Sequence, residues 1–151
     1  MRVRGIRWAI FAAALAAAAA GAAPEDDHRR GLQAYRRGDV VTAMNTLRAP
    51  AAAGYAPSQA LLAFILERAD VADEAVRLYR AAAEQGDAQA HAALAELYLS
   101  GRGVAKDEKQ ALAHFSKAVS LGHEASPIWQ ARIDELRRKG GASAPASGVA
   151  R

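Results

Sequence analysis

The sequence predicts an all-α fold made of three helix-turn-helix repeats and a C-terminal capping helix. Alanine supplies much of the hydrophobic fraction of 52%, whereas aromatic residues make up only 6% of the 151 residues. Alanine favours helices and buries little surface, and the β-branched and aromatic residues that suit sheets are sparse. The third observation is a pattern that recurs three times along the chain.

The recurring pattern is a small residue, a large apolar residue four positions later, and a glycine eleven positions after the small one. An offset of four places the first two on one helix face, and the glycine ends the helix. The copies begin 32 and 36 residues apart, which is typical of a helical repeat array. Each is expected to be the second helix of a pair. The copies are Ala43, Leu47, Ala51 and Gly54; Ala75, Tyr79, Ala83 and Gly86; and Ala111, Phe115, Val119 and Gly122.

The first helix of a pair is clearest at residues 88–100, where Asp87 is a good N-cap. A shift of 32 residues predicts an equivalent helix at roughly 57–68. Residues 25–37 are expected to form the first helix of repeat one in a looser register, followed by Gly38-Asp39 as helix stop and N-cap. The positions that this shift makes equivalent are Leu94 and Leu62, Ala95 and Ala63, Leu97 and Ile65, and Tyr98 and Leu66.

Repeat three carries an insertion, residues 101–104, whose two glycines allow a tight turn and whose Val104 is expected to dock into the helix pair. Asp107 and Gln110 predict a capping box for the next helix. A last helix, expected to run to about Lys139, would cap the array. It carries Ile128, Trp129, Ile133 and Leu136, and it either starts at Pro127 after Ser126 or starts nearer Glu124.

The N-terminus has the three parts of a secretory signal peptide. Arg2, Arg4 and Arg7 precede an uncharged apolar run and an A-x-A-like site at residues 20–22. The sequence therefore predicts a signal peptide at 1–22 cut after Ala22, a helical domain at 23–139, a disordered tail at 140–151, and a periplasmic or secreted bacterial protein. The alternative is a retained membrane anchor, although the run is shorter than the roughly 20 residues of a span. The chain has no cysteine for a lipid anchor or a disulfide.

Charge and motifs argue against several function classes. Without the three leader arginines the chain has 17 basic and 16 acidic residues, which gives no electrostatic case for nucleic acid. Hydrolase, phosphate-loop and zinc-protease motifs are absent, and no two of the four histidines are three or four residues apart. We therefore predict no enzyme, no catalytic residue, no cofactor and no metal.

Residues 81–122 resemble the Sel-like repeat family, a relative of the tetratricopeptide repeats. The family pattern is matched from Ala82-Ala83 and Gly86 through to Val119, with Ala95 in place of the usual glycine. Repeat two lacks the glycine insertion, and repeat one is closer to a tetratricopeptide unit. The resemblance implies a right-handed α-solenoid that binds protein partners, and His91 stands where the family often has glutamine, which favours a polar packing role. The residues that carry the match between these ends are Ala90, Leu94, Ala95, Tyr98, Gly101, Gly103, Val104, Asp107, Ala111 and Phe115.

The predicted function is an exported scaffold for protein–protein interaction in the bacterial envelope, with no stable membrane insertion after cleavage. The alternatives are a repeat-fold enzyme with an unrecognised site, or a membrane-anchored accessory subunit that is stable only with its partner. If first helices line the binding surface, Phe64 is either an exposed anchor there or a core residue of a slipped repeat two. The residues expected on the partner-binding groove are Phe64, Gln89, Ala92, Glu96 and Leu99.

Overall fold

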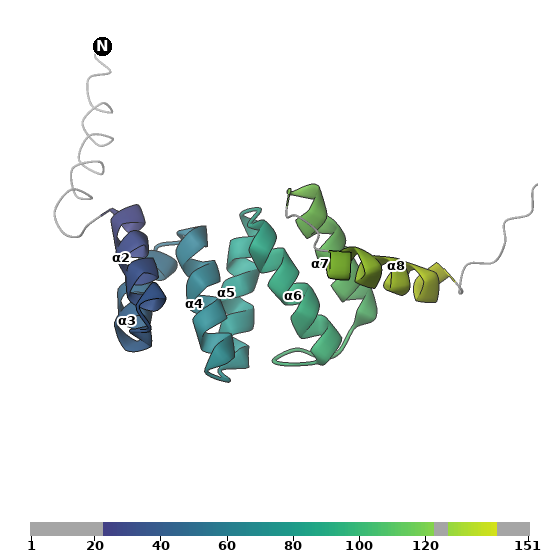
Figure 1. Cartoon of the computed structure of the whole chain (residues 1–151), viewed down its shortest axis with the longest axis horizontal. Coiled ribbons are helices and arrows are strands. Elements are labelled where there is room, and N and C mark those ends of the chain that lie inside the picture. The colour runs from purple at the N-terminus through teal and green to yellow at the C-terminus, as the bar shows by residue number, and fades with distance from the viewer. Residues whose placement is uncertain (1–22, 123–126, 142–151) are drawn as a thin grey trace, which may run out of the picture.

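The computed structural model describes residues 23–122 and 127–141, and these residues form helices without a strand. The helices follow one another along the long axis of the molecule (Figure 1). The predicted signal peptide and most of the predicted tail lie outside the described residues. The helices are α2 (Pro24–Arg36), α3 (Val40–Ala52), α4 (Ala56–Arg68), α5 (Ala72–Glu84), α6 (Ala88–Ser100), α7 (Glu108–Ser120) and α8 (Pro127–Gly141).

The three helix pairs repeat almost without deviation. Every helix from α2 to α7 has 13 residues, and the first helices α2, α4 and α6 begin 32 residues apart. The looser register predicted for repeat one is therefore wrong. The reason is Gly31, which occupies the position of Ala63 and Ala95: a Cβ there would lie 2.6 Å from Leu47 Cγ, so close packing required the smallest residue.

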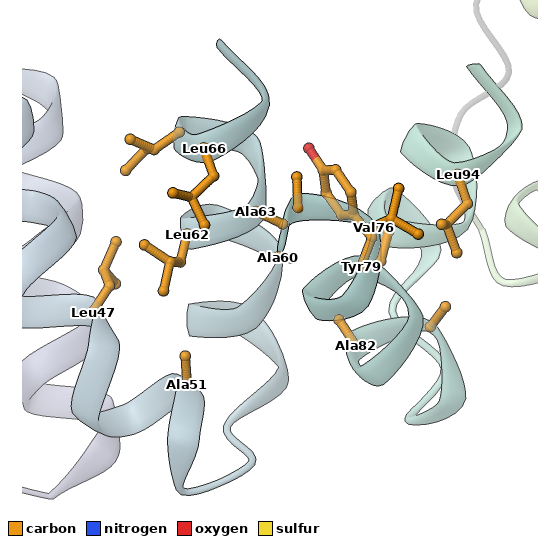
Figure 2. Packing of buried hydrophobic residues seen from close by; sticks show 14 of the residues in the cluster. Leu47, Ala51, Ala60, Leu62, Ala63, Leu66, Val76, Tyr79, Ala82 and Leu94 are labelled. Atoms are coloured by element: carbon orange, nitrogen blue, oxygen red, sulfur yellow. The ribbon is translucent and has the colours of Figure 1, made fainter. Parts of the chain in front are cut away.

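The small and large residues of the pattern form the core between the paired helices. Ala43, Ala75 and Ala111 have no exposed surface, and their partners Leu47, Tyr79 and Phe115 are at most 2% exposed. Figure 2 shows Leu47 facing α4. Each alanine allows close helix approach while the large residue fills the space beside it, as the sequence predicts.

The third position of the pattern behaves differently in the last repeat. Ala51 and Ala83 are buried, whereas Val119 is 36% exposed. In the first two repeats another helix pair follows and covers this position, but only α8 follows α7. Gly54, Gly86 and Gly122 nonetheless close all three pairs with positive φ angles of 84° to 87°, which confirms the predicted helix stops.

Aspartate caps open three of the helices. Asp39, Asp87 and Asp107 accept hydrogen bonds from main-chain N–H groups at the start of α3, α6 and α7. The predicted capping box is only half right, because the N–H of Asp107 donates to the Tyr98 carbonyl oxygen at 2.9 Å instead of to Gln110. That bond joins the start of α7 to the end of α6.

The insertion in repeat three folds back onto repeat two. Val104 packs against the core cluster, as predicted. A Cβ on Gly103, which has a φ of 66°, would lie 2.9 Å from the backbone of Ala72, so only glycine fits there. Arg102 reaches Glu67, whose main-chain oxygen accepts a 3.0 Å bond. The loop thereby fastens one repeat to the one before it.

The buried residues form two clusters, one running from α2 to α6 and one joining α6, α7 and α8. Ile133 and Leu136 of α8 pack in the second cluster, as expected for a capping helix. Gly140 and Gly141 belong to α8, which corrects the predicted start of the tail at 140. Residues 123–126 lie outside the described residues, so the choice between the two starts of this helix stays open. At 13 to 15 residues, the described helices are all too short or too polar to cross a bilayer.

Candidate binding groove

A groove of about 420 Å³ lies where the first helices of the three repeats meet. Its lining is more apolar than polar, and it includes the aliphatic side chains of Leu32 and Leu61. We call this surface the α2–α4–α6 groove. It is lined by His28, Leu32, Tyr35, Arg36, Pro57, Ala60, Leu61, Phe64, Asp87 and Gln89.

Two aromatic side chains from neighbouring repeats meet edge to face in the groove. The ring centroids of Tyr35 and Phe64 are 6.0 Å apart and their planes are inclined by 83°. The guanidinium of Arg68 lies 5.7 Å from the centroid of Phe64. Both rings are half-buried and pack against the core cluster, so each offers its remaining surface to the groove. A half-exposed aromatic pair that packs against the core on its inner side is the kind of surface that anchors a partner's side chain.

His28 is fixed at another part of the groove. Its Nδ1 lies 3.1 Å from Oγ of the buried Ser58, and its ring meets Tyr55 edge to face at 5.6 Å. Partial burial lowers the pKa of His28 below its ordinary value. A neutral imidazole near pH 7 leaves the groove wall here without charge.

Of the five predicted groove residues, Phe64 and Gln89 line the groove and Glu96 is exposed outside its lining. Ala92 is a correction, since it is only 2% exposed. Leu99 is another, because it does not line the groove and packs against the second cluster. Ala92, Ala95 and Leu99 recur at three- and four-residue spacing, so they share the α6 face that turns toward α7 and α8.

Phe64 satisfies neither of the two predicted alternatives completely. Its neighbours Leu62, Ala63, Ile65 and Leu66 are all at most 2% exposed, so repeat two has not slipped in register. Phe64 is nevertheless half-buried against Tyr35. Phe64 therefore contacts the core cluster on one side and lines the groove on the other.

The sequence argument missed the contribution of α2 to the groove. The signal was available, because the same shift of 32 residues places Leu32 on the position of Phe64 and Arg36 on that of Arg68. The assumption of a looser register in repeat one hid it.

A second polar cluster joins α6 and α7. Nδ1 of His91 and Nδ1 of His114 lie 2.9 Å apart, and His114 stacks on Tyr98 with a centroid distance of 5.5 Å. Burial lowers the pKa of both imidazoles, with Lys117 acting further on His91. The 23-residue separation hides this pair from any search for helical spacing.

The histidine pair does not amount to a metal centre. Within 23–122 and 127–141, no group of three or more histidine, aspartate or glutamate side chains is placed to hold an ion. The arrangement suits two neutral imidazoles that share one hydrogen bond between helices.

Comparison with known proteins places the repeats in a family. The Sel1 repeat model matches residues 56–87 and 88–123. These two stretches are α4 with α5, and α6 with the insertion and α7. The chain is a Sel-like repeat protein. Residues 24–52 lie outside the match, yet they form a helix pair of the same length and spacing.

Solved structures share the fold of this Sel-like repeat protein. A Sel1 repeat protein from Oxalobacter formigenes is 26% identical with a TM-score of 0.67, over 80% of this chain and 50% of its own. A protective antigen of uropathogenic Escherichia coli with an SLR fold is 20% identical with a TM-score of 0.58, over 85% of this chain and 34% of its own. The second likeness concerns the fold alone.

An uncharacterized protein of Neisseria meningitidis serogroup B is 43% identical over 102 residues. That stretch covers 64% of this Sel-like repeat protein and 21% of the Neisseria protein. The chain thus spans about a fifth of that relative and half or less of the two solved structures.

Proposed function

We propose that this chain is an exported, non-catalytic adaptor of the bacterial envelope that binds a protein partner in the α2–α4–α6 groove. The observation that carries the proposal is the half-exposed pair of Tyr35 and Phe64, contributed by two adjacent repeats to one apolar hollow. A pocket shared between repeats suits a ligand that runs across several helices, as a peptide segment does.

The titratable groups of the groove support binding in preference to catalysis. Asp87 is committed as the N-cap of α6, where it accepts a 2.7 Å bond from the Ala90 N–H. His28 bonds Ser58 and meets the ring of Tyr55 edge to face. The Ser58 hydroxyl that His28 contacts has no exposed surface, so this pair is not placed to attack a substrate in the groove.

The proposal is tested in a bacterial host that exports the full chain. The mature protein is expected in the periplasm with its N-terminus at Ala23, because residues 1–22 have the composition of a signal peptide. Mass measurement checks this, and a full-length chain in the membrane fraction would favour the anchored alternative.

Binding is tested with the mature protein as bait against an envelope extract. Phe64→Ala should lose the specific partner, whereas Glu96→Ala should keep it, because Glu96 has the same helix position in α6 but lies outside the groove lining. Equal capture by both variants would refute the groove as the binding surface.

A further inference from the structure

Two arginines near the aromatic pair indicate what kind of segment the groove binds. Three hollows meet around Tyr35, Arg36, Phe64 and Arg68. The groove contributes the first three of these residues, a second hollow is lined by Phe64 and Arg68, and a third by Tyr35, Arg36 and Arg68. The aromatic pair and the two arginines are therefore shared among neighbouring hollows.

Neither arginine has an acidic partner in the described part of the chain. Arg36 and Arg68 are exposed, and no carboxylate there lies within ion-pair distance of either. The acidic residues nearest in sequence to Arg68 line the same hollow as Arg68 but pair with another arginine. Glu67 and Asp70 both pair with Arg102, at 3.5 and 3.6 Å.

The two arginines occupy equivalent positions in the first and second repeats. Each is the last residue of its helix, α2 or α4, and each follows an apolar groove residue by four positions: Leu32 before Arg36, and Phe64 before Arg68. An offset of four places both members of a pair on one helix face. In α6 the same two positions hold Glu96 and Ser100. The apolar-then-arginine unit is thus confined to the two repeats that form the aromatic pair.

A basic residue at a helix C-terminus also complements the helix dipole, which is a purely structural role. The dipole requires only a positive charge, and lysine provides it equally well. A planar guanidinium differs because it binds a carboxylate with two parallel hydrogen bonds. Replacement by lysine therefore separates the two roles.

We infer that the α2–α4–α6 groove binds an extended acidic peptide segment of a protein partner. An apolar side chain of the segment packs against Tyr35 and Phe64, and its aspartate or glutamate carboxylates pair with Arg36 and Arg68. This inference rests on the proposed function, since it specifies the ligand of the same groove.

The test measures fluorescence anisotropy of the mature protein with three labelled peptides of about ten residues. The first carries glutamates around a central phenylalanine, the second replaces every glutamate with glutamine, and the third replaces the phenylalanine with glycine. The first should bind about tenfold or more tightly than either of the others, and a rise from about 50 to 500 mM NaCl should weaken it, because salt screens exposed charges.

Arginine variants test whether Arg36 and Arg68 are responsible for binding the acidic peptide. The double variant Arg36→Gln/Arg68→Gln should weaken the acidic peptide about tenfold, and Arg36→Lys/Arg68→Lys should fall between it and the wild type. Arg77→Gln is the matched control, since Arg77 is an exposed α5 arginine outside the groove lining. Circular dichroism confirms that each variant is folded.

Several outcomes would overturn the inference. Equal binding of the glutamate and glutamine peptides would do so, as would an unchanged affinity of the double glutamine variant, or competition by inorganic phosphate or a single-stranded oligonucleotide as strong as that by the acidic peptide. If the neutral peptide binds and Phe64→Ala abolishes its binding, the groove remains a protein-binding site and only its acidic specificity fails. A native partner captured independently of Phe64 would refute the proposed function itself.

Discussion

Helices α4 and α6 have the same length and the same register, yet they present different chemistry on one of their faces. On the inward face Leu62 and Leu94 are equivalent, and both are at most 2% exposed. On the groove side Phe64 of α4 corresponds to Glu96 of α6. The repeat therefore constrains only the residues that hold the helices together. The groove face is free to vary, and it is there that one repeat differs from the next.

The largest losses of stability should come from substitutions on the inward faces, where α4 and α6 are alike. Leu62→Ala and Leu94→Ala should each reduce the free energy of unfolding by about 2–5 kcal/mol, because each leaves a cavity in a close-packed core. Urea denaturation measures both. A cost below about 1 kcal/mol for either would contradict the equivalence of the two inward faces.

The loops that follow α4 and α6 should respond in opposite ways to changes between glycine and a residue with a side chain. Gly103→Ala should destabilise the protein by about 2 kcal/mol, because its Cβ would overlap the backbone of Ala72 and its φ is positive. The shorter loop after α4 has Asp70 at a φ of 63°, where Gly38 stands after α2. Asp70→Gly should therefore stabilise slightly, by up to about 1 kcal/mol. Thermal unfolding should show a lower melting temperature for Gly103→Ala and a slightly higher one for Asp70→Gly.

The groove position should separate the two helices most clearly. Phe64→Ala should cost about 2 kcal/mol, less than the roughly 3–5 kcal/mol of a fully buried phenylalanine, because the ring is half-buried against Tyr35. Glu96→Ala should change stability by less than about 0.5 kcal/mol, as exposed substitutions do. A full loss of about 4 kcal/mol at Phe64 would mean that its ring is a core residue after all.

The smallest effect concerns the position of Gln59 in α4 and His91 in α6. Gln59 donates to the Ala51 carbonyl at 3.1 Å, and the imidazole of His91 bonds the equivalent Ala83 main chain. Only the histidine titrates. Its lowered pKa means that the unfolded chain binds protons more readily, so stability should fall as the pH decreases from about 7 to 5.

The variant that tests this pH dependence is His91→Gln, which copies α4 onto α6. It should fold and should reduce the pH slope of the urea midpoint, with part of the slope remaining because the pKa values of His28 and His114 are also lowered. An unchanged slope would show that His91 has the same pKa in the folded and the unfolded chain.

The sequence predicts the fold well because its signals are local and repeated. The spacing of Ala43, Ala75 and Ala111 located the second helices, and their burial follows from close packing that tolerates no larger residue. The groove was predicted less well. Ala92 was misplaced because an alanine-rich helix does not reveal which of its faces is covered until the neighbouring helices are known. The pairing of His91 with His114 depends on tertiary contact between helices and leaves no local trace.

Helix α6 belongs to both buried clusters, with Leu94 in one and the adjacent Ala95 in the other. Unfolding of such a molecule need not occur in a single step. If α7 and α8 detach, α6 keeps its contacts with α5 through Leu94 and stays in place, so we expect opening to begin at the C-terminal end. Amide protons of α7 and α8 should then exchange with solvent faster than those of α4 and α5. The protein would have two folding units that meet within one helix.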